Sequence, residues 1–257
     1  MANDYFKFHQ FTVRQDRCAM KVGTDGTLLG AWAQGGQTVL DIGTGTGLIA
    51  LMMAQRFPKA CVVGIDIDHE AVSQARENVA ESPFRNIEIV EADVKNFSTE
   101  VWSSARPESI TTHRSFDFDT ICSHGFSTFN AIVSNPPYFV DSLECPDNQR
   151  TQARHTSSLT YRDLMSAVGR LLSDDGEFSV VIPFDSKKLL ESEAALAGLF
   201  KVRECAVRTT PRKLPKRYLL AFRKHPAALE VTEGIIEIAP NVRSEWYQQL
   251  TKDFYIK

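Results

Sequence analysis

A cluster of glycines between two apolar stretches is the first feature of the sequence that could do chemistry. Asp41 ends a short apolar run, and a long apolar stretch with helical character follows the cluster. The glycines are Gly43, Gly45 and Gly47. Glycines at such a turn let the backbone bend tightly and approach a ligand, and the start of the next helix presents free N–H groups. The dinucleotide pattern G-x-G-x-x-G would need glycine at position 48, where Leu48 stands. A carboxylate at this turn would repel a pyrophosphate and suits a ligand with a positive centre, which favours S-adenosylmethionine over NAD.

Two further acids follow the next two apolar runs. Asp66 ends the second run, where a carboxylate can accept hydrogen bonds from both hydroxyls of a ribose. Asp68 is an alternative in the same turn. Asp93 ends the third run and could accept a hydrogen bond from an adenine amino group. Each acid alone could be a helix cap, but acids at three successive strand ends beside a glycine cluster predict a nucleoside site.

A rigid turn follows the fourth apolar run. It reads Asn135-Pro136-Pro137-Tyr138. The two prolines fix the backbone and remove two N–H donors, and Pro136 keeps Asn135 out of the helical region. Such a turn can aim the Asn135 side-chain oxygen and the Pro136 carbonyl at one NH2 group, which stabilises the positive charge that develops when a planar amine is alkylated. Tyr138 can stack on a base. The alternative is an ordinary strand-to-loop turn with a capping asparagine.

Strand and helix patterns alternate around these residues. The predicted strands are 38–42, 61–68, 87–93, a run that opens at 130, 177–183, 201–208 and 217–223. The predicted helices are 48–57, 69–82, 161–172 and 186–200. The alternation predicts an α/β fold, doubly wound, with a mostly parallel, seven-stranded, Rossmann-like sheet. Its parallel strands bring the glycine cluster, the acids and the Asn135 turn to one edge.

Two segments lie outside that alternation. An N-terminal extension covers 1–35, and within it Thr24 or Asp25 could cap a short helix. Residues 98–129 form an inserted loop, longer than most connections in compact domains. We expect residues 1–257 to form a single domain.

Longer motifs make the chain resemble a known family. The glycine cluster, the acids and the NPPY turn resemble class I S-adenosylmethionine-dependent methyltransferases that act on planar amines. The segments FTVRQDRCAMKVGTDGTLLGAWA, SLECPDNQRTQARHTSSLTY, LPKRYLLAF and TKDFYIK resemble those of the tRNA1(Val) (adenine(37)-N6)-methyltransferases, over nearly the whole chain. The resemblance implies methyl transfer from S-adenosylmethionine to N6 of adenine 37 in the anticodon loop. It implies catalytic roles for Asn135, Pro136, Pro137 and Tyr138. It assigns cofactor binding to Asp41, Gly43, Gly45, Gly47, Asp66 and Asp93, with Lys21, Thr24 and Asp25 at the methionine end.

A basic stripe covers residues 201–224 of a chain whose net charge is −3. The stripe holds nine basic residues and one acid, Glu204. A local excess of positive charge is typical of a polyanionic partner, although a solvated strand-loop-strand could look the same. We expect tRNA phosphates to contact Arg208, Arg212, Lys213, Lys216 and Arg217, with Arg150 and Arg154 and also Arg14, Arg17 and Arg162.

Composition and the remaining motifs narrow the function classes. A hydrophobic content of 43% with 24% charged residues excludes a fibrous or largely disordered chain. The polar start and the lack of a long apolar run predict a cytoplasmic protein without a membrane span. Cys122, His124 and Cys145 match no zinc spacing, so we expect no metal site. Nothing resembles a coiled coil, and we expect a monomer.

Several alternatives stay open. A related enzyme with the same turn could methylate a base of rRNA or DNA, or a protein glutamine. Other classes are a Rossmann-fold oxidoreductase, against which Leu48 and the NPPY turn argue, and an RNA-binding module that has lost catalysis.

Overall fold

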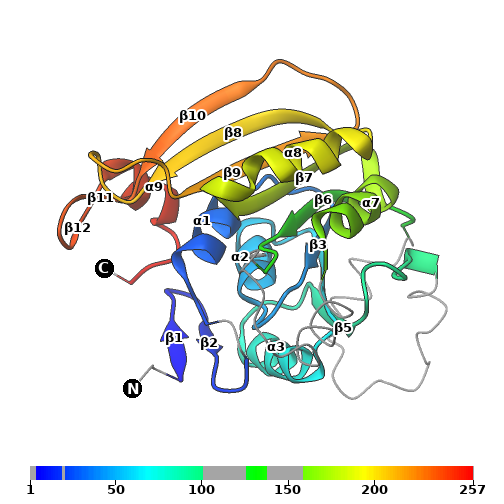
Figure 1. Ribbon diagram of the computed structural model, residues 1–257. Helices are drawn as coiled ribbons and strands as arrows, with labels where there is room; N and C mark the ends of the chain where they lie inside the picture. Colours follow the sequence, from blue (N-terminus) through cyan, green and yellow to red (C-terminus); the bar gives the residue numbers. More distant parts are fainter. Residues whose placement is uncertain (1–3, 19–20, 101–125, 138–158, 257) are drawn as a thin grey trace, which may run out of the picture.

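A central sheet of eight strands forms the middle layer of the protein (Figure 1). The computed structural model describes residues 4–18, 21–100, 126–137 and 159–256. The strand order is β10-β8-β9-β7-β6-β3-β4-β5. The strands are β3 (Thr38–Ile42), β4 (Cys61–Asp66), β5 (Ile87–Glu91), β6 (Phe129–Ser134), β7 (Leu172–Pro183), β8 (Phe200–Arg208), β9 (Arg217–Arg223) and β10 (Glu230–Ile235). All neighbouring pairs are parallel except those that β9 makes with β7 and β8. The predicted α/β, mostly parallel, Rossmann-like fold is therefore confirmed.

The eighth strand, β10, is the main difference from the predicted sheet. All seven predicted strands are present, and β10 pairs in parallel with β8 at one edge. Four of its six residues are exposed. Because an exposed edge strand lacks an apolar pattern, nothing in the sequence marks it as a strand.

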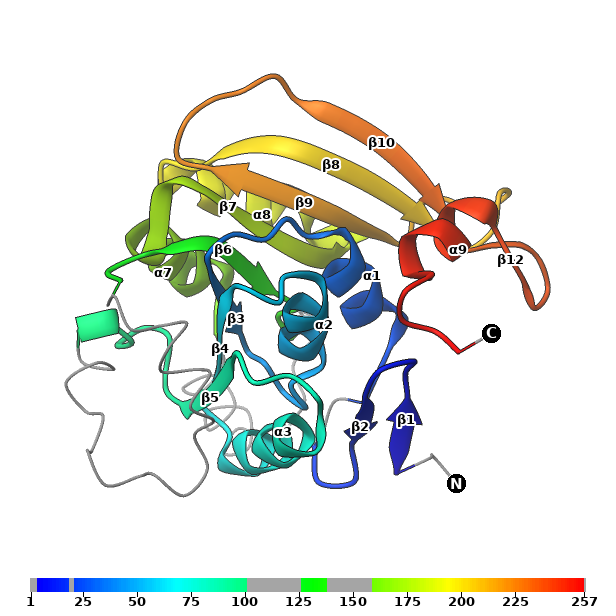
Figure 2. The same cartoon turned by 180° about the vertical axis from the view of Figure 1, so that it is seen from behind.

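Helices cover both faces of the sheet, as Figures 1 and 2 show from opposite sides. One face carries α1 (Thr24–Trp32), α2 (Leu48–Arg56), α3 (His69–Glu81) and α9 (Glu245–Thr251), and the other carries α7 (Tyr161–Leu171) and α8 (Lys187–Leu196). Alternate strand residues face the two layers, so Val39 belongs to the first core cluster and Leu40 to the second. None of the helices in these described ranges is long and apolar enough to cross a membrane.

The N-terminal extension packs on the face that carries α1. It forms a hairpin of β1 (Tyr5–Lys7) and β2 (Thr12–Arg14), followed by α1. The prediction that Thr24 or Asp25 caps this helix is wrong: both residues lie inside its first turn, and the N-cap is Gly23. A second hairpin, β11 (Glu237–Ala239) with β12 (Val242–Arg243), follows β10, and a single 3-10 turn (Phe184–Ser186) precedes α8.

The carboxyl ends of the parallel strands define one edge of the sheet, which we call the carboxyl edge. The glycine loop follows β3 there, Asp66 ends β4, and Asn135 follows β6. Pro183 at the end of β7 pairs with Arg217 at the start of β9, which in turn pairs with Val207 of β8. The loop between β8 and β9 therefore lies at the same edge as Asn135.

Candidate active site

The glycine loop adopts a backbone that only glycine takes easily at three positions. Gly43, Gly45 and Gly47 have φ values of 70°, 55° and 80°, which lie in the left-handed region that disfavours a Cβ. The N–H groups of Gly43 and Thr44 each donate to the Ile65 carbonyl at 2.9 Å. A Cβ at Gly43 would meet no atom within 4 Å. The loop thus holds an open space in front of its backbone.

Asp41 lies beneath this loop rather than in front of it. Its carboxyl is fully buried, and Oδ2 accepts hydrogen bonds from the Thr44 hydroxyl at 2.7 Å and the Ala50 N–H at 3.1 Å. Burial raises the pKa of Asp41 to about 7, although these two hydrogen bonds act in the opposite direction. The expectation that Asp41 faces a positive ligand centre is not supported, since it lines neither cavity described below. Its contacts instead tie the glycine loop to α2.

A first cavity, of about 240 Å³, lies between the glycine loop and the ends of β4 and β5. Asp66 and Asp93 both line it. The Asp66 carboxylate accepts hydrogen bonds from the Gly45 N–H at 2.9 Å and the Asp68 N–H at 3.0 Å. Asp68 caps α3 by accepting from the N–H groups of its first turn, so Asp66 is the better candidate for a ribose ligand. Apolar side chains complete the wall: Ile42, Ile65, Ile67, Ala71, Ala92, Val94 and Leu159.

A second cavity, of about 260 Å³, lies on the other side of the loop. Lys21, Thr24 and Asp25 line it together with Gly43 and Gly45. The three residues that the family resemblance assigns to the methionine end therefore lie beside the glycine loop. Arg217 also lines this cavity and forms an ion pair with Asp25. The sequence did not predict that Arg217 lines a cavity, because its place in the basic stripe indicates a surface residue.

Asn135 lines both cavities. The preceding Ser134 hydroxyl donates to the Ile42 carbonyl at 2.9 Å, which fixes the end of β6 against β3. The Asn135 side-chain oxygen is buried and accepts no hydrogen bond. Such an oxygen is costly unless a ligand supplies a donor. Pro136 is buried and Pro137 lines the first cavity, whereas Tyr138 lies outside the described residues.

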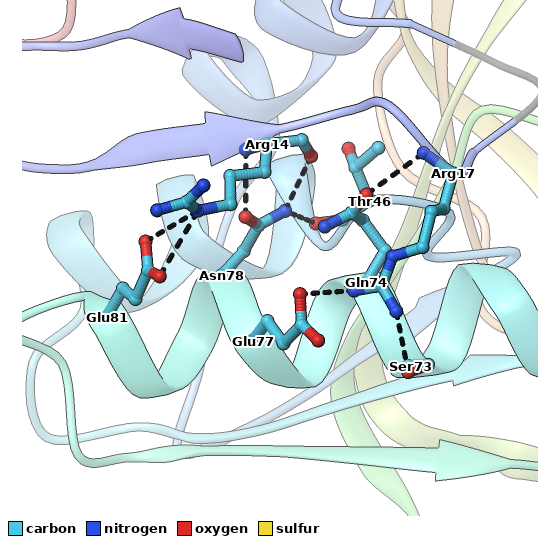
Figure 3. A network of polar contacts seen from close by, with 8 residues as sticks. All are labelled: Arg14, Arg17, Thr46, Ser73, Gln74, Glu77, Asn78 and Glu81. Carbon is cyan, nitrogen blue, oxygen red and sulfur yellow. Dashed lines mark hydrogen bonds and ion pairs between the residues drawn. The ribbon is translucent and has the colours of Figure 1, made fainter. Parts of the chain in front are cut away.

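A network on α3 attaches the N-terminal extension to the glycine loop (Figure 3). The buried Asn78 side chain accepts from the Arg14 N–H at 2.8 Å and donates to the Arg14 and Thr46 carbonyls, each at 2.9 Å. The Arg14 and Arg17 guanidinium groups form ion pairs with Glu81 and Glu77 on the same helix. The two arginines that we had expected to contact phosphates are therefore engaged with α3.

The basic stripe divides into paired and exposed residues. Ion pairs engage Lys201, Arg203, Arg208, Arg217, Arg223 and Lys224. Arg162 likewise pairs with Glu193. Arg217 is buried, so its predicted contact with RNA at the surface is corrected, and Arg208 is held by Glu233 at 3.2 Å. Arg212, Lys213 and Lys216 are exposed in the loop between β8 and β9. Arg150 and Arg154, and residues 101–125 of the predicted inserted loop, lie outside the described residues.

Comparisons with known proteins agree with this fold. A family model described as "Methyltransferase domain" matches residues 33–206, so the chain is a methyltransferase-domain protein. A predicted O-methyltransferase from Agrobacterium tumefaciens has the same fold, with a TM-score of 0.62 at 19% identity over 90% of this chain and 96% of that one.

The curated relatives narrow the class to one family. A tRNA1(Val) (adenine(37)-N6)-methyltransferase of Bacteroides thetaiotaomicron is 45% identical over 100% of this chain and 99% of its own length. One of Histophilus somni is 39% identical over 98% of this chain and 97% of its own. The chain belongs to the tRNA1(Val) (adenine(37)-N6)-methyltransferase family.

Proposed function

We propose that the protein transfers a methyl group from S-adenosylmethionine to N6 of adenine 37 in tRNA1(Val). Membership of the family supports this reaction. The observation that carries it is Asn135, which lines both cavities and whose side-chain oxygen is buried without a hydrogen-bond partner. An acceptor in that position suits the N–H group of an amine that is about to be methylated.

The residues around the two cavities fit S-adenosylmethionine. Asp66 and Asp93 in the first cavity match the ribose hydroxyls and the adenine amino group, and its apolar wall matches the adenine ring. The second cavity, beside Lys21, Thr24 and Asp25, matches the amino-acid end. Asp41 acts indirectly, by holding the loop. When bound, the cofactor supplies an electrophilic methyl group on a sulfonium.

The chain's own residues orient the acceptor and stabilise its charge. Asn135 Oδ1 and the Pro136 carbonyl accept the two hydrogens of the adenine amine, which directs its lone pair at the methyl group. The stiffness of Pro136 and Pro137 keeps both acceptors in place before the substrate arrives, and such preorganised acceptors need no reorganisation as charge develops. Because both acceptors are neutral, the surplus proton leaves to solvent after the transfer. Tyr138 stacks on the extruded base, whose extrusion from a loop costs at most a few kcal/mol.

The exposed loop between β8 and β9 is the proposed tRNA contact. Its Arg212, Lys213 and Lys216 lie at the carboxyl edge, on the same side of the sheet as Asn135. Arg150 and Arg154 remain part of the proposed contact. Phe8 and Phe254 share one core cluster, which supports a single working unit over 1–257. Because its proposed substrate is tRNA, we propose that the enzyme acts in the cytoplasm, and that it acts as a monomer.

Asn135→Ala separates the catalytic role from cofactor binding. The variant should bind S-adenosylhomocysteine as the wild type does, because Asp66 and the glycine loop are intact. It should lose at least about a hundredfold in kcat, the typical cost of removing one preorganised hydrogen-bonding group. The assay offers total tRNA, DNA and protein from cells lacking the enzyme as separate acceptors of tritiated methyl, followed by mass spectrometry of the tRNA nucleosides. Unchanged turnover, or label in DNA or protein instead of N6-methyladenosine in tRNA, would contradict the proposal.

A further inference from the structure

The guanidinium of Arg217 is buried and only partly satisfied. Arg217 is 8% exposed and its Nε has no hydrogen-bond partner. One terminal nitrogen, Nη1, donates to Asp25. A buried guanidinium nitrogen without an acceptor is costly in a folded protein, so the cavity that Arg217 lines is where its missing partner should lie.

Two elements far apart in the sequence place this pair. Arg217 is the first residue of β9, held by pairing with Pro183 of β7 and Val207 of β8. Asp25 lies in the first turn of α1, 192 residues earlier. The side chains are mostly enclosed, with exposed fractions of 10% for Arg217 and 23% for Asp25. A fixed cation and a fixed anion thus lie side by side in one wall of the second cavity.

We propose that Arg217 binds the carboxylate of the amino-acid end of S-adenosylmethionine and that Asp25 binds its ammonium group. This inference rests on the proposed function, because it assigns the cofactor's nucleoside to the first cavity. The amino-acid end is a zwitterion, and the Arg217–Asp25 pair has the complementary order of charges. The unpartnered Nε is part of the planar fork with which arginine binds carboxylates.

A carboxylate fits this position better than a phosphate of the RNA backbone. Arg217 lies inside a cavity of about 260 Å³ that also holds Gly43, Gly45 and Asn135, and a small terminal group can enter it. An RNA backbone at the protein surface can instead contact the exposed Arg212, Lys213 and Lys216. The Arg217–Asp25 pair therefore binds the cofactor, and the loop between β8 and β9, which precedes Arg217, contacts RNA.

Two adenosine ligands that differ in the amino-acid end test this assignment. S-adenosylhomocysteine carries the zwitterion, whereas 5′-methylthioadenosine ends in a methyl group. Isothermal titration should show that Arg217→Gln weakens S-adenosylhomocysteine about ten- to a hundredfold, the range of a lost charge-assisted hydrogen bond. Binding of methylthioadenosine should change less than about twofold on the same scale. Asp66→Asn is the matched control, which should weaken both ligands alike.

Further variants guard against a loss of folding. Arg217→Lys keeps the charge but not the fork and should lie between the wild type and Arg217→Gln, and Asp25→Asn should also weaken S-adenosylhomocysteine alone. Equal losses for both ligands, no loss for either, or a loss confined to tRNA binding would each overturn the role of Arg217. If Asp66→Asn weakens both ligands while Arg217→Gln weakens neither, only this inference fails. If the wild type binds neither ligand, the proposed function fails with it.

Discussion

Two buried oxygens without a partner, one on Asp41 and one on Asn135, differ in what lies beside them. Asn135 faces both cavities, whereas Asp41 lies under the glycine loop and lines neither. The unpartnered oxygen therefore indicates a ligand contact at Asn135, whereas at Asp41 it is an unfavourable consequence of burying the carboxyl under the glycine loop. Position relative to the cavities decides between these interpretations.

The Asp41 carboxyl makes stability depend on pH. Its pKa is about 7 in the folded protein and about 3.9 in an unfolded chain. The folded state thus holds a proton that the unfolded state has lost, so the free energy of unfolding falls between about pH 4 and pH 7, by up to about 1.4 kcal/mol per pH unit. Asp41→Asn should remove this slope. Urea unfolding at pH 5 and pH 7.5 checks this prediction. Between these two pH values the wild type should lose more free energy of unfolding than the variant does. An equal loss in both proteins would contradict the assignment.

The individual site residues were predictable where they follow an apolar run. Asp66 ends β4, while Asp93 and Asn135 follow the ends of β5 and β6 within two residues. Their positions were predictable because the carboxyl ends of parallel strands share one edge. Arg217 could not be placed, since its partner Asp25 is 192 residues away and its neighbours in the sequence are exposed lysines and arginines. The burial of Asp41 was equally hidden, because it depends on how α2 packs.

At the scale of elements, the hairpin of β1 and β2 is joined to the glycine loop through α3. Asn78 is the shared contact, with one hydrogen bond from the Arg14 N–H and one each to the carbonyls of Arg14 and Thr46. No local pattern signals this link, because Asn78 looks like a polar residue on a helix surface. The apolar runs of the seven central strands, in contrast, were sufficient to predict the sheet, and only the exposed β10 escaped.

Asn78→Ala tests whether the extension supports the site. The change leaves three backbone groups without their side-chain partner, namely the buried Thr46 carbonyl and the partly buried N–H and carbonyl of Arg14. It should lower the free energy of unfolding by about 2–4 kcal/mol. It should also weaken S-adenosylhomocysteine, because Thr46 lines the second cavity. Ser73→Ala removes only the 3.3 Å contact with Arg17 at the helix surface and should cost less than about 0.5 kcal/mol. Equal unfolding midpoints for the two variants in urea would show that Asn78 contributes no more than a surface contact.

At the scale of the whole molecule, the carboxyl edge carries both the cavities and the exposed part of the basic stripe. Most of the stripe neutralises acids within the protein; Arg203 and Arg223, for example, share the buried Glu177. The count of basic residues in the sequence therefore overstates the charge available to a partner. Within the basic stripe, the positive charge that no acid in the described part of the chain pairs with is concentrated in the short loop between β8 and β9.

Salt dependence measures how many of these charges meet phosphates. Replacing Arg212, Lys213 and Lys216 by glutamine should weaken tRNA binding and reduce the slope of log K against log salt by about two to three. Affinity for S-adenosylhomocysteine should not change, since none of the three lines a cavity described here. Lys59→Gln is the control, because this exposed lysine precedes β4 at the opposite edge. An unaltered slope in the triple variant would place the RNA elsewhere.

The wall of the second cavity has a consequence for how the chain holds together. Its residues run from Lys21 to Arg217 and come from the extension, the glycine loop, the start of α2, the turn after β6 and the first residue of β9. A small molecule bound in this cavity contacts segments that are far apart in the sequence and so holds them together. By thermodynamic linkage, whatever binds there suppresses local opening of α1 and of β9 at once. Local unfolding of either α1 or β9 should therefore be coupled to release of the bound ligand.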